Sequence, residues 1–333
     1  MKKFDYDVII GHSLIQKKLR QAVESDHTVS TYLFCGNAGI GKKTMARAFA
    51  ASLLCQSPID GGPCHSCSSC RLLASDNHPD YLVVQIPEDK KTIGVEQVRE
   101  QVIKEAYIRP FHAGRKVFVI ENSEALTLEA QNALLKILEE PPAYAVFLLL
   151  SPTPDQLLQT VLSRCLKLQF LPLSDSLCRD FFEKQTAEEG RKALAASFSQ
   201  GNIGRGLTIL NDEEYYQLYQ ATLAQLAAFP KSRTALVDMQ QFFTQNRERI
   251  ADVIDFMLIF LRDSMRQKIS KNPGLICVDH KSAIERFAHA NTPGGLVRTT
   301  EAVLDFRKRI SKNASFSAAG LELLTKMQEE IHG

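Results

Sequence analysis

Apolar and polar positions follow two different periods along the first half of the chain. Nearly continuous apolar runs are typical of strands buried on both faces of a parallel sheet. Between them lie stretches in which apolar residues recur with the spacing of one helix face. This alternation predicts an α/β core, with a parallel sheet covered by helices on both faces. The predicted strands are residues 32–35, 81–86, 116–120, 145–150 and 166–170, and the predicted helices are 12–26, 45–54, 95–106 and 128–140.

Beyond Pro172 the pattern is helical throughout. A short helical segment at 174–210 ends in a glycine-rich stretch, and breaks between the later helices coincide with proline, glycine and asparagine. We therefore predict a core at 1–171, a small helical part at 172–210 and an all-helical domain at 211–333. The longer helical stretches are 212–228, 247–271, 280–290, 295–311 and 316–331.

A glycine-rich loop joins the first predicted strand to the following helix. Residues 36–44 read GNAGIGKKT, close to the phosphate-binding template of Gly, four residues, Gly, Lys, then Ser or Thr. Lys43 stands where the template has the hydroxyl that binds Mg²⁺, and Thr44 comes one residue late, about 100° further round the helix. A glycine turn without a ligand is the alternative. The candidate phosphate-binding residues are Gly36, Gly39, Gly41, Lys42, Lys43 and Thr44.

Glu121 and Asn122 follow the predicted strand 116–120. A working nucleotide motor has a Mg²⁺-binding Asp here, and then a Glu that orients the attacking water. Glu121 keeps a carboxylate, whereas Asn122 cannot act as a general base. The missing hydroxyl and the missing base are independent losses, so we expect poor hydrolysis and no well-formed Mg²⁺ site. Weak binding of ATP or ADP stays open, as does a plain loop without any ligand.

Four of the eight cysteines form a compact group in the sequence: Cys55, then Cys64, Cys67 and Cys70 as C-x2-C-x2-C. Four thiolates at this spacing suit a tetrahedral Zn²⁺, and a Gly-Gly-Pro turn at 61–63 lets the chain fold back on the metal. An iron–sulfur cluster and a set of free thiols are the rivals, and His65 could replace one ligand. Because no acid or base adjoins the group, we expect a structural zinc knuckle.

Composition and charge limit the number of domains and the kinds of partner that this chain can have. The chain has 333 residues, 44% hydrophobic and 23% charged, which allows two or three ordinary globular domains. A net charge of +2 means that any nucleic-acid contact must come from a local patch. Acidic residues near the N-terminus argue against a signal peptide, and no apolar run is long enough for a membrane span. We therefore expect a cytoplasmic protein with no membrane contact.

Taken in order, these features resemble one family. The degenerate Gly-loop, the four-Cys knuckle after its helix, the run NALLKILEEPP at 132–142 and the tripeptide Ser-Arg-Cys at 163–165 are similar to the AAA+ subunits of bacterial clamp loaders. Within that group they are most similar to the delta-prime subunits of DNA polymerase III. The run at 132–142 is the most specific of these motifs.

The resemblance implies an AAA+ nucleotide-binding core with a zinc knuckle, a small helical lid and an all-α collar. It implies that gamma/tau and delta subunits are partners in a hetero-pentameric ring, which loads the sliding clamp onto primed DNA. It also implies that Arg164 projects into the nucleotide site of a neighbouring motor subunit, where a guanidinium stabilises the transferred phosphate. By itself, an arginine at a strand entrance is usually a surface ion-pair partner. A largely silent ring subunit is therefore expected, with little ATPase activity of its own.

Other functions remain in competition. An active, gamma/tau-like motor subunit is opposed by Lys43, by Asn122 and by Gly204, which stands where motor subunits place a lid arginine. A free-standing zinc protein that binds nucleic acid would need basic and aromatic residues around the knuckle, and the sequence has no aromatic residue between the knuckle and Tyr81. A nucleotide kinase would share the Gly-loop but would need neither the collar nor the cysteines.

Overall fold

The computed structural model describes residues 4–112, 114–229, 234–270, 274–312 and 314–332. These residues pack as two compact units. The first unit contains Met1–Leu177 together with the short segment Gly201–Gly204, and the second contains Cys178–Gln200 and Arg205–Gly333. Each unit is described by itself below. The predicted boundary between a lid and a collar at residue 210 stays a prediction.

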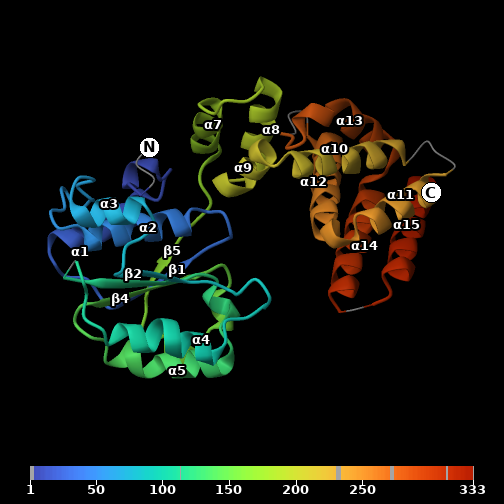
Figure 1. The fold of residues 1–333 in the computed structure, drawn as a ribbon. Helices are drawn as coiled ribbons and strands as arrows, with labels where there is room; N and C mark the ends of the chain where they lie inside the picture. The colour runs from blue at the N-terminus through green and yellow to red at the C-terminus, as the bar shows by residue number, and fades with distance from the viewer. Residues whose placement is uncertain (1–3, 113, 230–233, 271–273, 313, 333) are drawn as a thin grey trace. The chain divides into compact units, whose positions relative to one another are not determined.

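The first unit is built on a parallel sheet (Figure 1). Its strands are β1 (Thr31–Cys35), β2 (Tyr81–Val84), β3 (Lys116–Ile120), β4 (Ala145–Ser151) and β5 (Leu166–Gln169). The order across the sheet is β2-β3-β4-β1-β5, so β1 pairs with both β4 and β5. The five predicted strands are confirmed, and their carboxyl ends meet at one edge, where parallel sheets bind ligands. The Gly-loop, Glu121 and Ser151 all lie at this edge.

Helices cover both faces of the sheet, as predicted (Figure 1). They are α1 (Ser13–Glu24), α2 (Lys42–Leu54), α3 (Ser68–Ala74), α4 (Val95–Val98), α5 (Leu128–Glu139) and α6 (Gln159–Leu162). Successive side chains of a strand point to opposite faces. Tyr32 and Phe34 therefore join the core under α1 and α2, whereas Leu33 and Cys35 join the core formed with α4 and α5.

Local signals account for the ends of these helices. Thr127 caps α5 by accepting a hydrogen bond from the Ala130 N–H (3.3 Å). The predicted single helix at 95–106 differs from the structure, because α4 continues into a π-helical turn, η2 (Arg99–Lys104). The side-chain pattern does not reveal the wider turn, since Val98 and Val102 are buried here and apolar residues four apart are also typical of one face of an α-helix.

The second unit is helical, and its core includes Phe256 and Phe260. Its helices are α7 (Asp175–Glu183), α8 (Glu189–Ser199), α9 (Ile203–Asn211), α10 (Glu213–Ala228), α11 (Ala235–Gln245), α12 (Ile250–Ile269), α13 (Lys281–Ala290), α14 (Pro293–Ser311) and α15 (Phe316–His332). The first residues of α7 and α9 belong to the first unit. Helix α12 packs against α10, α13 and α14, and α15 packs against α11 and α14. Among the described residues, no helix is long and apolar enough to cross a membrane.

Candidate functional site

The Gly-loop follows β1 at the carboxyl edge of the sheet. The Gly36 N–H donates to the carbonyl of Ser151 at the end of β4 (3.2 Å), which anchors the start of the loop. Gly36, Gly39 and Gly41 have φ angles of 146°, 80° and 103°, a region that residues with a Cβ rarely adopt. A Cβ on Gly36 would lie 2.6 Å from the Phe170 carbonyl oxygen, whereas one on Gly41 would meet nothing within 4 Å. The loop is therefore packed at its start and open beside Gly41.

Lys42 begins α2, and its side chain turns back onto the loop. Its Nζ donates to the carbonyls of Gly36 (2.5 Å) and Asn37 (2.9 Å). Burial lowers the pKa of this ammonium, and the loop carbonyls supply the polar contacts that a buried charge needs. A phosphate bound by Lys42 would have to compete with these two carbonyls.

Lys43 and Glu121 form an ion pair at the carboxyl edge of the sheet. The Lys43 Nζ lies 2.6 Å from Glu121 Oε2, and the same oxygen accepts a hydrogen bond from Gln85 Nε2 (2.9 Å). Glu121 is only 9% exposed, and a carboxylate so buried needs partners of this kind. An ammonium has no lone pair for a metal. Glu121 Oε2 already accepts hydrogen bonds from two donors, Lys43 Nζ and Gln85 Nε2. The residues present therefore do not fit Mg²⁺.

Neither Asn122 nor Thr44 joins this pair. Asn122 lies in the left-handed region (φ 51°), is exposed, and donates from Nδ2 to Glu124 Oε1 (3.3 Å). Thr44 is exposed on the first turn of α2. An amide cannot take a proton from an attacking water, so the position of Asn122 offers no base. The binding roles predicted for the Gly-loop residues, Glu121 and Asn122 stay predictions.

The segment Gly201–Gly204 packs directly on the Gly-loop. The Gly204 N–H donates to the Gly39 carbonyl (3.0 Å), and the Asn202 side chain donates to the Ala38 carbonyl (2.5 Å). A Cβ on Gly204 would lie 2.6 Å from the Gly39 Cα. A side chain at position 204, including the arginine of a motor subunit, would therefore push this segment off the loop.

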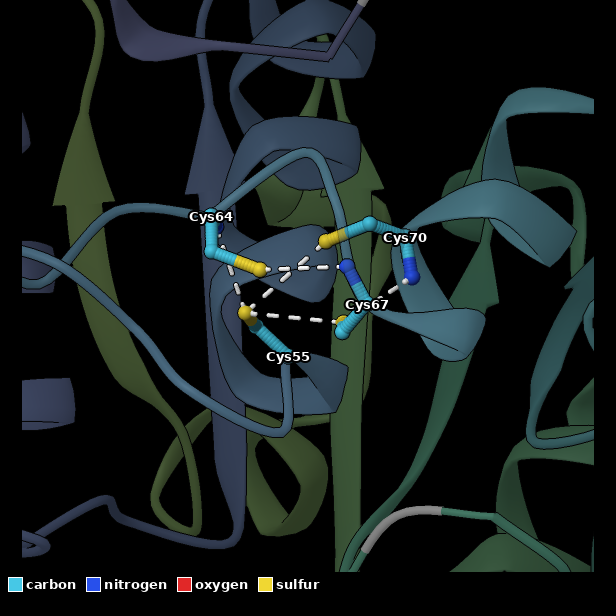
Figure 2. Close-up of side chains that lie close together, drawn as sticks. All are labelled: Cys55, Cys64, Cys67 and Cys70. Carbon is cyan, nitrogen blue, oxygen red and sulfur yellow. Dashed lines mark hydrogen bonds between the residues drawn. The ribbon is translucent and has the colours of Figure 1, made fainter.

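The four cysteines of the knuckle converge beside α2, and their sulfur atoms point toward one another (Figure 2). All four Sγ atoms lie within 4.8 Å of one another, and Cys55 Sγ is 3.8 Å from Cys70 Sγ and 4.0 Å from Cys67 Sγ. Sulfurs bound at about 2.3 Å to one tetrahedral zinc are themselves about 3.8 Å apart, whereas disulfide sulfurs are about 2 Å apart. The donor set therefore fits a metal ion, and the cysteines are unbridged.

Hydrogen bonds prepare the sulfurs for the negative charge of a metal-bound thiolate. The backbone N–H groups of Cys64, Cys67 and Cys70 donate to Cys55 Sγ (3.2 Å), Cys64 Sγ (3.4 Å) and Cys67 Sγ (3.4 Å). Hydrogen bonds from Ser66 lower the pKa of Cys64 to about 5, whereas burial raises the pKa of Cys55 and Cys70. A bound cation would supply the positive charge that the two buried thiolates need.

Flanking residues hold the knuckle in place. Gly61 makes the predicted turn with a φ angle of 66°, and a Cβ there would lie 2.4 Å from the Arg20 carbonyl oxygen. His65 does not join the cysteines. Its Nε2 lies 2.7 Å from Asp5 Oδ2, and its ring packs on Phe4 with the ring centroids 5.2 Å apart. The histidine thus ties the N-terminal segment to the knuckle.

A hydrogen-bonded chain that the sequence pattern does not predict links the knuckle to the residues before β2. Ser69 Oγ donates to the Leu54 carbonyl (2.6 Å) and lies 2.7 Å from His78 Nε2. His78 Nδ1 accepts from the Asp80 N–H (3.0 Å), which assigns the ring proton to Nε2. Leu54 directly precedes Cys55, and Ser69 directly precedes Cys70. These hydrogen bonds therefore fix the positions of both segments that carry the cysteines. The residues of this hydrogen-bonded chain share no local pattern that could have revealed it.

Arg164 lies between α6 and β5. Its guanidinium forms an ion pair with Glu139 at the end of α5 and donates to the carbonyl of Thr160 (2.6 Å). The side chains of Arg164 and Glu139 are 29% and 50% exposed, so the pair is within reach of solvent. Arg164 therefore has the ion-pair partner expected of an ordinary surface arginine, on a partly open surface.

Known proteins resemble this chain over nearly its whole length. The family described as DNA polymerase III, delta subunit matches residues 11–174, and its C-terminal counterpart matches residues 213–325. The delta' subunit of Haemophilus influenzae is 30% identical over 309 residues, which cover 90% of each chain. This chain belongs to the family of DNA polymerase III delta' subunits. The delta' subunit of Bacillus subtilis is 27% identical over 95% of each chain, and that of Pseudomonas aeruginosa is 47% identical over 145 residues, 43% of each chain.

Membership of the delta' family makes this chain a clamp-loader subunit of DNA polymerase III, as expected. The first matched region contains the Gly-loop, the four cysteines and Arg164. The second begins with α10 and ends within α15, so it consists of the helices after residue 212.

Proposed function

We propose that this delta' subunit occupies one position of a hetero-pentameric clamp-loader ring without hydrolysing ATP efficiently itself. Its partners would be gamma/tau and delta subunits, and through the ring it would act on the sliding clamp and primed DNA. The observation that carries the proposal is the ion pair between Lys43 and Glu121. This pair takes up both positions through which a motor subunit would hold Mg²⁺, so it also opposes an active motor function.

The second part of the proposal assigns Arg164 to a neighbouring subunit. The arginine is partly exposed, and its tripeptide is one of the motifs of the family. A subunit whose own site lacks a base can still supply a guanidinium in trans, where it stabilises charge on the transferred phosphate. Glu139 would hold the Arg164 side chain until a nucleotide phosphate in the neighbouring subunit takes the place of the Glu139 carboxylate.

The third part assigns a structural Zn²⁺ to Cys55, Cys64, Cys67 and Cys70. The sulfur spacing supports a tetrahedral ion. The bound ion would neutralise the buried thiolates and join the end of α2 to α3. The cluster holds four sulfur donors without an adjoining acid or base, which favours a structural role over a catalytic one.

The assembly experiment tests the proposed function directly. Mixing this chain with purified gamma/tau and delta subunits is expected to give one stable hetero-oligomer that contains a single copy of this chain. Size-exclusion chromatography with light scattering would measure its mass and composition. Elution of this chain as a separate monomer, under conditions in which the other subunits associate, would contradict a place in the ring.

Hydrolysis by the isolated chain is expected to be negligible. Asn122 offers no base, and Lys43 occupies the Mg²⁺ position, so turnover should stay far below about 1 s⁻¹, the low end for typical enzymes. A phosphate-release assay with excess Mg²⁺ measures the rate, and Lys42→Ala identifies any contaminating activity. Turnover near that value which Lys42→Ala abolishes would establish a working motor.

A further inference from the structure

The ammonium of Lys43 lies where a nucleotide motor has its metal-binding hydroxyl, and it faces the carboxylate that would complete the metal site. Its side chain is 65% exposed, whereas that of its partner Glu121 is 11% exposed. An ammonium carries three N–H donors, and Glu121 Oε2 engages one of them. The other N–H donors of this exposed ammonium can still reach a ligand beside the loop.

We propose that the Lys43 ammonium takes the place of Mg²⁺ in this chain, and that the Gly-loop holds nucleoside polyphosphates without a divalent cation. The inference rests on the proposed loss of hydrolysis at the same loop. It adds the chemical form of the ligand, which is the metal-free nucleotide rather than its magnesium complex.

Charge and geometry both favour the metal-free form. At the position that the phosphate-binding template gives it, a Mg²⁺ carried in by ATP would lie beside the Lys43 ammonium, and two neighbouring cations repel each other. It would also find Glu121 Oε2 already bonded to Lys43 and Gln85. Free ATP meets neither obstacle, because its phosphate oxygens can accept hydrogen bonds from Lys43 directly.

The loop itself leaves room for phosphate. The space beside Gly41 is open, since a Cβ there would meet nothing within 4 Å. Gly41 is the N-cap of α2, and the first N–H groups of a helix have no partners within the helix. These amides, the helix dipole and Lys43 together provide the hydrogen-bond donors and the positive electrostatic potential that a polyphosphate needs.

Calorimetric titration of the full chain tests the proposal, with ATP as the probe in two buffers, one containing EDTA and one containing excess Mg²⁺. The unmutated chain is expected to bind ATP about tenfold more tightly in EDTA. Lys43→Thr restores the hydroxyl of the phosphate-binding template and removes the fixed charge. It should reverse the preference, so that Mg²⁺ strengthens binding by about tenfold.

Lys104→Thr is the matched control, because Lys104 is 66% exposed and also pairs with a glutamate, Glu100. It should leave both affinities unchanged, and thermal melting would establish that each variant is folded. A requirement for Mg²⁺ in the unmutated chain, no ATP binding in either buffer, or equal behaviour of Lys43→Thr and the unmutated chain would each overturn the proposal. None of these results would alter ring assembly or the role of Arg164, which are measured separately.

Discussion

Cys67→Ser is expected to remove the zinc of the knuckle while sparing the start of α3. Cys67 Sγ accepts a hydrogen bond from the Cys70 N–H as the N-cap of that helix, a position at which serine is favoured. The substitution therefore keeps the cap and deletes one thiolate. Loss of an outer-shell partner typically costs 10–100-fold in metal affinity, so loss of a direct ligand should cost more than about 100-fold. Competition with a chelator of known affinity measures the change.

The effect on the fold should be confined to the knuckle. Amide hydrogen exchange is expected to rise across residues 55–74 and to stay unchanged in β1 and β4, whose side chains lie in the two cores of the sheet. Cys165→Ser is the control, since Cys165 is partly buried like Cys67 but lies outside the group. Elemental analysis should find about one zinc in the control. Iron in the unmutated protein, less than about half an equivalent of zinc, or equal zinc in the two variants would contradict the assignment.

The elements that could be predicted are those whose signal is local. The run 145–150 predicts β4 because burial on both faces leaves a continuous apolar segment. Thr127 predicts the start of α5 because a capping hydroxyl acts within three residues. The cysteines predict a metal site because ligand spacing along the chain limits their distance in space. Helix α11 could have been predicted too, since Met239, Phe242 and Phe243 are buried at helix spacing.

Contacts between distant segments could not be predicted in the same way. The ion pair of Lys43 with Glu121 depends on the strand order, which places β4 between the strands that lead to these residues. The packing of Gly204 on Gly39 depends on the return of a segment from beyond β5 to the first unit. Sequence pattern shows that Lys43 is the wrong residue for a metal site, but only the fold shows which carboxylate it meets.

Arg164→Ala is expected to leave the ring assembled and to slow ATP hydrolysis at the one motor site that this chain would serve. The loss at that site could approach about 10³-fold, the lower end for arginine fingers. Stability should change little, because Arg164 and Glu139 are both partly exposed and such pairs contribute little. Arg164→Lys should not restore the rate, since an ammonium lacks the planar fork that a phosphate engages. The assay needs a reconstituted loader in which the other motor sites are silenced.

Two further variants separate a finger from an ion-pair partner. Glu139→Gln removes the charge that holds Arg164 within its own chain but leaves the guanidinium available, so hydrolysis should not fall. Arg20→Ala removes an arginine with the same 29% exposure, which pairs with Asp7, and should also have no effect. If Arg164 acts only by binding Glu139, then Glu139→Gln should slow hydrolysis as much as Arg164→Ala does. A loader with Arg164→Ala that assembles normally and hydrolyses ATP at the unmutated rate would reduce Arg164 to the surface ion-pair partner that its contacts also permit.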